Sequence, residues 1–377
     1  MLGRPCGAKS ASDFATTATR PAGQREKKVW WHTLFGASAV IEPVWRGSGQ
    51  QVRPFLRSAA VTARSCSLPL QRAMTDFGAD HGFGQVPKKL QEHYGITIAV
   101  STVRKITAGQ GTHMLEQQDR VSLPVNTPGC RQQIGDIDGS MVPIVTIGAE
   151  AGDKRKQKTL QWQEARLVLV HAHGSVTPKF AATFGGSGEE SGQALRSCAV
   201  AAGFGTTTQV HGVGDGAVWI AEQFAATFGP QASYLVDFYH VCDYLAEASK
   251  TCAPNAPHAW LETQKRLLKN NDRMGVLNQL RDYVEAEEVA TDQAPVRACV
   301  RYLSNRPHHL DYKGALEKGL PIGSGEIESA HRYVIQQRLK LPGAWWKADN
   351  VEPMLALRVV RANEDWEKYW ENLAAAA

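Results

Sequence analysis

The middle of the chain alternates between two hydrophobic patterns. Short apolar runs bounded by glycine predict strands, and apolar residues spaced three and four apart predict helices between them. The predicted strands span residues 134–145, 165–171, 209–213 and 233–238, and a predicted helix spans residues 217–228. The first strand is either continuous or broken at Gly139. Successive strands followed by alternating helices and strands predict an α/β fold.

The N-terminal part has a different pattern. Residues 1–28 are polar and basic, and we expect them to be disordered. Strand-like runs follow at 29–31 and 37–45, and helices are expected at 70–77, 85–94 and 101–108. The last helix would begin at a Ser101 N-cap and carry Arg104 and Lys105. This pattern is typical of a helix-turn-helix that reads DNA, but a plain three-helix packing unit fits it about as well.

The C-terminal part is mostly helical. Residues 246–318 have apolar positions at helical intervals, and packing is their default explanation. A glycine-rich turn then leads into a helix for which Ser324 is a plausible N-cap. The tryptophans of the last 33 residues are expected in the core more often than on a base-stacking surface. Together the patterns divide the chain into regions 1–28, 29–65, 66–125, 130–245, 246–318 and 319–377.

Charge is distributed unevenly. Residues 1–135 hold 17 Lys and Arg against 8 Asp and Glu, whereas the rest of the chain holds 25 against 29. A basic N-terminal third suggests an anionic partner, although a solvated basic tail would give the same count. The seven cysteines are scattered, with no C-x-x-C pair and no zinc-finger spacing. We therefore expect reduced thiols, a cytoplasmic protein and no membrane partner.

Three carboxylates lie at positions that are typical of active sites. Asp138 lies in the first predicted strand, Asp215 follows another strand, and Glu328 follows the glycine-rich turn. Acids at the carboxyl ends of strands lie where open α/β sheets place their active sites. Each acid alone has an ordinary explanation, because a turn aspartate can bind its own backbone and a helix start favours acids. The three together predict a metal or proton-transfer site, with Asp136 and Glu326 as near neighbours in sequence that could be mistaken for members.

These residues carry a resemblance to a known family. The chain resembles bacterial insertion-sequence transposases of the DDE class in the Kra-type family, with Mutator-like enzymes as more distant relatives. The resemblance runs from about Val29 to the C-terminus. It rests on segments 138–143 (DGSMVP), 162–166 (WQEAR), 214–220 (GDGAVWI), 237–240 (DFYH), 321–329 (PIGSGEIES) and 337–340 (QRLK), and on Leu357, Arg358, Ala362, Asn363 and Trp366. In the family the turn is followed by two apolar residues, the acid and then serine, so Glu328 aligns with the family acid although Glu326 fills an apolar place.

The resemblance implies a fold and a reaction. It implies a ribonuclease-H-like core interrupted by a helical insertion, and two Mg²⁺ ions, replaceable by Mn²⁺, held by Asp138, Asp215 and Glu328. Asp138 would bridge the two ions, which would cleave and join DNA by in-line phosphoryl transfer. The implied partners are double-stranded DNA, as terminal inverted repeats and target DNA, and further copies of the chain assembled on it. The implied location is the bacterial cytoplasm, at the nucleoid when DNA is bound.

Two further groups have candidate roles. Asp237 and His240 form a D-x-x-H pair after a strand, and Mutator-like relatives carry a similar pair, so we expect them to support the catalytic acids. Lys154, Arg155 and Lys156 lie on a loop, where they would clamp a phosphate backbone or be merely solvated. Two alternative functions stay open: a metal-dependent nuclease of the same fold that only cleaves, and a degenerate transposase that only binds DNA.

Overall fold

The computed structural model describes residues 24–47, 50–58, 65–118, 125–148, 153 and 157–376. The chain separates into two compact units, one formed by residues 1–107 with 367–377 and the other by residues 108–366. Lys154, Arg155 and Lys156 lie outside the described residues, so the predicted phosphate clamp stays a prediction. In the part of the chain that is described, no helix combines the length and apolar character needed to span a bilayer.

The first unit joins a small antiparallel sheet to helices. The sheet has the order β1-β2-β3, and a three-helix core packs around Leu70, Met74, Leu90 and Val103. Its elements are β1 (Gln24–Thr33), β2 (Gly36–Gly47), β3 (Gln50–Val52), α1 (Pro54–Ser58), α2 (Leu68–Asp80), α3 (Val86–Tyr94) and, up to Thr107, α4 (Val100–Glu116).

Local sequence explains where these helices begin and end. Ser67 caps α2 by accepting a hydrogen bond from the Leu70 amide, and Gly95 ends α3 in the left-handed conformation at φ 67°. The three predicted helices are confirmed, but two details were wrong. Residues 24–28 of the expected disordered tail form the start of β1, because they pair with β2. Ser101 lies inside the first turn of α4 rather than at its N-cap, because α4 begins one residue earlier at Val100.

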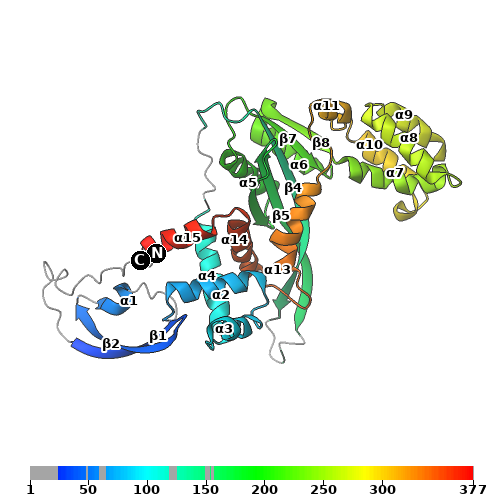
Figure 1. Cartoon of the computed structure of the whole chain (residues 1–377). Helices are drawn as coiled ribbons and strands as arrows, with labels where there is room; N and C mark the ends of the chain where they lie inside the picture. The colour runs from blue at the N-terminus through cyan, green and yellow to red at the C-terminus, as the bar shows by residue number, and fades with distance from the viewer. Residues whose placement is uncertain are drawn as a thin grey trace. The chain divides into compact units, whose positions relative to one another are not determined.

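The second unit is built on a mixed five-stranded sheet in the order β6-β5-β4-β7-β8 (Figure 1). Strands β4, β5 and β6 form an antiparallel meander, and β7 and β8 add in parallel to β4. The strands are β4 (Gln132–Ile147), β5 (Lys158–Ala172), β6 (Lys179–Phe184), β7 (Gln209–Gly214) and β8 (Ala232–Val236). The predicted mixed α/β architecture is therefore confirmed, and β4 is continuous through Gly139.

Two helices cover one face of this sheet. Helices α5 (Gly188–Ala201) and α6 (Val218–Phe228) pack Leu195 and Phe224 against Ile137 and Val168 in a buried cluster. Side chains alternate along a strand, so Ile137 points to this face whereas its neighbours Asp136 and Asp138 point to the other one. The alternation decides which residues of β4 are available for chemistry.

A helical region follows β8, as the pattern of residues 246–318 predicted. It comprises α7 (Phe238–Cys252), α8 (Pro257–Lys269), α9 (Arg273–Leu280), α10 (Pro295–Ser304) and α11 (Tyr312–Glu317), with short turns η3 (Arg281–Tyr283) and η4 (Thr291–Gln293); another short turn, η2 (Gly229–Gln231), precedes β8. Its core joins Leu245, Leu268, Leu303 and Tyr312 to Val236 of β8. The helical region has its own core, which extends to the edge of the sheet (Figure 1).

The chain then returns to the sheet. The returning elements are α12 (Gly325–His331), the π-helical turn η5 (Arg332–Gln336), α13 (Gln337–Leu339), η6 (Ala348–Asn350) and α14 (Val351–Ala362). The last helix, α15 (Trp366–Ala375), belongs to the first unit from Glu367 onward. Arg358 of α14 is buried and donates hydrogen bonds to the carbonyls of Tyr333 and Val334, which holds the π-helical turn. The core assignment of the tail is confirmed for Trp346 and Trp370 and wrong for Trp345, whose side chain is exposed.

Candidate active site

The parallel pairing of β4 and β7 ends just before two of the predicted acids. Asp136 pairs with Val213; Asp138 lies two residues further along β4, and Asp215 is the first residue after β7. The parallel pairing ends at Asp136 and Val213, so each of the two acids follows the last paired residue of its chain segment by two positions. Asp215 is exposed, and its Oδ1 accepts a hydrogen bond of 2.8 Å from the Ala217 amide.

Helix α12 lies against β4 and β5 and supplies the other acids and a histidine. Nε2 of His331 lies 3.1 Å from Oδ2 of Asp138, and Nε2 of His171 on β5 lies 3.0 Å from Oε2 of Glu326. Both imidazoles are buried, and neither of these nitrogens has an aligned hydrogen-bond partner. These are close charge contacts rather than well-directed hydrogen bonds.

The two glutamates of α12 lie in different surroundings. Both side chains are exposed, but Glu326 contacts His171 and interacts with Asp136, whereas no ion pair of Glu328 is found among the described residues. Alignment with the resembled family selects Glu328, while the geometry of the described residues brings Glu326 closer to the aspartates. The sequence pattern gave no signal for the contact between His171 and Glu326.

Asp136 is the most buried acid of the site. Its side chain is 2% exposed, and its Oδ1 has no hydrogen-bond partner among the described residues. Burial raises the pKa of Asp136 well above its usual value, and the negative charges of Glu326, Asp237 and Asp138 raise this pKa further. The sequence analysis treated Asp136 as a decoy for Asp138, but it lies at the centre of a group of four carboxyl groups.

Asp237 connects a strand end to the glycine-rich turn. Its Oδ1 caps α7 by accepting hydrogen bonds from the amides of Tyr239 and His240, at 2.6 and 3.0 Å. Its Oδ2 accepts hydrogen bonds from the Ser324 amide and hydroxyl, at 2.6 and 2.5 Å. Ser324 occupies the N-cap position of α12, but its hydroxyl binds Asp237 rather than the helix. Gly323 has no side chain because a Cβ there would lie 2.7 Å from the Tyr239 ring.

The expected pairing of Asp237 with the His240 ring is not present. Asp237 binds the backbone amide of His240, while the His240 ring lies 5.5 Å from the Tyr244 ring and 5.7 Å from the Tyr302 ring, measured between centroids. The imidazole therefore belongs to an aromatic group in the helical region. Helix capping explains the difference, since an aspartate before a helix satisfies free amides of the first turn.

Further contacts anchor the turn before α12 to the strand ends. Nε2 of His211 on β7 lies 3.0 Å from the Pro321 carbonyl, and Nε2 of His173 lies 3.1 Å from the Gly319 carbonyl. The Phe238 amide donates to the Ile322 carbonyl at 2.8 Å. Burial lowers the pKa of His211, so this imidazole is neutral at pH 7. These contacts fix where α12 begins relative to the sheet.

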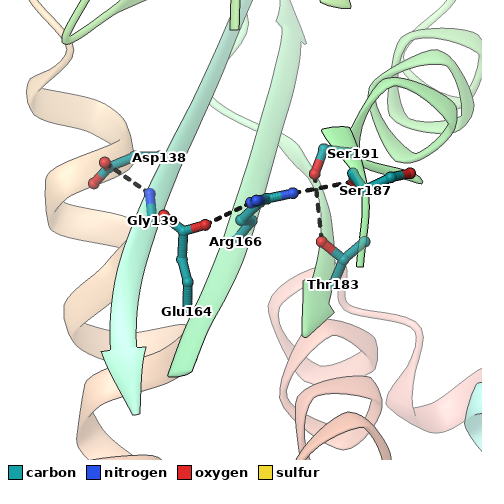
Figure 2. A network of polar contacts seen from close by, with 7 residues as sticks. All are labelled: Asp138, Gly139, Glu164, Arg166, Thr183, Ser187 and Ser191. Atoms are coloured by element: carbon teal, nitrogen blue, oxygen red, sulfur yellow. Dashed lines mark hydrogen bonds and ion pairs between the residues drawn. The ribbon is translucent and has the colours of Figure 1, made fainter. Parts of the chain in front are cut away.

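The face of β4 opposite the Asp138 side chain carries a further polar network (Figure 2). Glu164 lies against Gly139, where a Cβ would come within 2.3 Å of its carboxylate, so the glycine after Asp138 makes room for Glu164. Glu164 accepts a 2.7 Å hydrogen bond from Arg166, and Arg166 donates to the Ser187 carbonyl at 3.0 Å. Figure 2 shows Asp138 on one side of this strand pair and Arg166 reaching toward Ser187 on the other. This network gives the WQEAR segment a role in supporting the strands.

The candidate DNA-binding residues of α4 are accessible. Ser101, Arg104 and Lys105 are exposed on α4, while Val103 and Ile106 are buried in the three-helix core. The helix therefore presents two cations to solvent, as a reading helix would.

Metal ligation has partial support in the geometry. Carboxylates are the oxygen donors that Mg²⁺ prefers, and the crowding around Asp136 would be relieved by a cation. Among the described side chains, however, no three His, Cys, Asp or Glu residues are grouped so that they could hold a metal ion. Asp138 and Asp215 instead use carboxylate oxygens on nearby amides.

Comparison with known proteins gave one family match. A family model described as "Uncharacterised protein family (UPF0236)" matches residues 204–371, which include Asp215, Asp237 and the acids of α12. The match covers less than half of the chain and leaves out Asp138. No curated protein matches the chain. The transposase resemblance therefore stays a prediction from the sequence motifs.

Proposed function

We propose that this protein cleaves and joins DNA by metal-dependent phosphoryl transfer, as a transposase of the DDE class. The observation that carries the proposal is the parallel β4–β7 pairing, whose last paired residues, Asp136 and Val213, each stand two residues before Asp138 and Asp215. The strand order β6-β5-β4-β7-β8, with an antiparallel meander followed by two parallel strands, supports a ribonuclease-H-like core. The helical region between β8 and α12 stands where the resembled family has its insertion.

The chemistry follows from the donor set. Bound Mg²⁺ would activate a water or 3′-hydroxyl nucleophile and stabilise the leaving oxygen. In this proposal Asp138 and Asp215 hold the ions, together with a glutamate of α12. His331 of α12 then contacts Asp138 of β4, and His171 of β5 contacts Glu326 of α12. The exposed cations Arg104 and Lys105 of α4 contribute binding of duplex DNA.

The test is cleavage of DNA by the purified full-length protein in Mg²⁺. The substrates are a supercoiled plasmid and duplexes carrying the sequences that flank the gene. We expect Asp138→Asn and Asp215→Asn to abolish cleavage while DNA binding is retained, because both acids would hold the metals. Asp243→Asn is the matched control, since Asp243 is an exposed aspartate on α7.

Two results of this assay would oppose the proposal. One is cleavage at the wild-type rate in both active-site variants, and the other is cleavage that persists in EDTA. Cleavage without joining of a pre-cut end to target DNA would favour the nuclease alternative. Specific binding without any cleavage would favour a protein that only binds DNA.

The third acid is decided by a parallel pair of variants. The family resemblance selects Glu328, and the geometry brings Glu326 to Asp136 and His171. Glu326→Gln and Glu328→Gln keep the side-chain size and remove one charge each. The acid that holds metal is the one whose loss abolishes cleavage, and the other change should be milder.

A further inference from the structure

The helical region reaches the turn that carries Asp215. The Tyr302 hydroxyl on α10 donates a 2.6 Å hydrogen bond to the Asp215 carbonyl. Just beyond α10, Nε of Arg306 donates a 2.6 Å hydrogen bond to the next carbonyl, that of Gly216. Two successive carbonyls after β7 are thus bound by one short segment about 90 residues further along the chain.

The turn itself leaves little room for movement. Gly216 has φ 80°, and a Cβ there would lie 2.6 Å from Arg306 Nε and 2.8 Å from the Tyr302 hydroxyl. The Gly216 amide contacts the Tyr234 hydroxyl at 3.3 Å, and the Ala217 amide binds Oδ1 of Asp215. Only glycine combines this positive φ with enough room for the Tyr302 hydroxyl and the Arg306 side chain.

Tyr302 is in turn held by its neighbours. Its ring stacks on the Tyr244 ring at 4.3 Å and 22°, and the Arg306 guanidinium lies 3.9 Å from the ring centroid. The residue is 6% exposed, and burial raises the pKa of Tyr302, so the hydroxyl keeps its proton and remains a donor. The His240 ring contacts the same group, which gives that residue a place in the support of the turn.

We infer that Tyr302 and Arg306 are positioning residues, through which the helical region holds Asp215 in the orientation that phosphoryl transfer requires. The inference rests on the proposed function for the role of Asp215, but the contacts themselves can be tested separately. A carboxylate that shares a metal must be fixed to within a fraction of an ångström. Loss of an outer group that orients such a ligand typically lowers activity about 10- to 100-fold.

The first measurement is hydrogen–deuterium exchange of the Tyr302→Phe protein. This change removes the hydroxyl and keeps the ring that stacks on Tyr244. We expect the amides of Gly216 and Ala217 to exchange about 2- to 12-fold faster, which corresponds to the net worth of one hydrogen bond. Tyr244→Phe is the matched control, because it removes a hydroxyl from the same stack without touching the turn, and it should leave this exchange unchanged.

The second measurement is DNA cleavage as a function of Mg²⁺ concentration. Tyr302→Phe should lower the maximal cleavage rate about 10- to 100-fold and raise the Mg²⁺ concentration at half-maximal rate, while the KM for DNA stays the same. Arg306→Lys keeps the positive charge over the ring and removes the Nε donor, so it should shift both measurements in the same direction.

The outcomes separate the inference from the proposed function. Unchanged exchange at Gly216 and Ala217 in both variants would overturn the inference. Faster exchange throughout α7 and α10 would also overturn it, because it would mean that Tyr302 only packs the helices. Wild-type-like cleavage and Mg²⁺ dependence would also overturn it. If the wild-type protein does not cleave DNA while the exchange results hold, the proposed function fails and the contact to the Asp215 turn stands.

Discussion

Asp237 offers the sharpest test of how the turn before α12 is held. Its buried carboxylate accepts hydrogen bonds from two amides of α7 and from the amide and hydroxyl of Ser324. Asp237→Ala removes an N-cap, which costs about 1 kcal/mol. It also leaves the buried Ser324 amide without its acceptor, at about 1–3 kcal/mol. We therefore expect the free energy of unfolding to fall by about 2–4 kcal/mol, a large share of the roughly 5–15 kcal/mol of an ordinary protein.

The assay is urea unfolding followed by tryptophan fluorescence, with Asp243→Ala as control. Asp243 is exposed on the same helix, so its loss should change the free energy by less than about 0.5 kcal/mol. A double-mutant cycle with Ser324→Ala should give a coupling of about 1–3 kcal/mol, because the two side chains share a 2.5 Å hydrogen bond. Additive losses, or an Asp237→Ala protein that is as stable as the control but catalytically dead, would refute the clamp and make Asp237 a catalytic group.

Three further predictions concern buried groups. Because the pKa of Asp136 is raised in the folded state, folding takes up a proton, and the free energy of unfolding should fall as pH rises above about 4. In urea unfolding measured with EDTA, Asp136→Asn should flatten that decline and raise the free energy of unfolding at pH 7. Arg358→Lys should lower the free energy of unfolding by about 2–4 kcal/mol, since lysine cannot replace the hydrogen bonds to the carbonyls of the π-helical turn, and unchanged urea unfolding would contradict that role. Burial raises the pKa of Cys198 and of Cys299 to about 12 each, so both thiols should react with a disulfide reagent at pH 8 only after urea is added, and reaction in the native protein would contradict their burial.

Local pattern predicted the elements of this protein well. Four of the five strands of the larger sheet and most helices were read from apolar periodicity, since burial of one face imposes that period on the sequence, whereas β6 and α5 were not predicted. The position of Asp215 directly after β7 followed from the same reasoning, because the apolar run of that strand ends at this acid. The strand at 24–28 was missed because its polar residues follow no apolar pattern and gain their order from pairing with β2.

The partners of the acids could not be predicted in this way. His171 meets Glu326 and His331 meets Asp138 across long stretches of chain, and both contacts depend on how α12 lies against β4 and β5. Asp136 and Asp138 follow the same local pattern, yet one is buried and the other is partly exposed. The sequence by itself determined most of the strands and helices and showed that Asp215 and Asp237 directly follow strands, because these properties depend on neighbours along the chain. Only the tertiary structure decided which carboxylates crowd together and what holds them, because burial and charge contacts depend on distances that the packing of α12 and α10 creates.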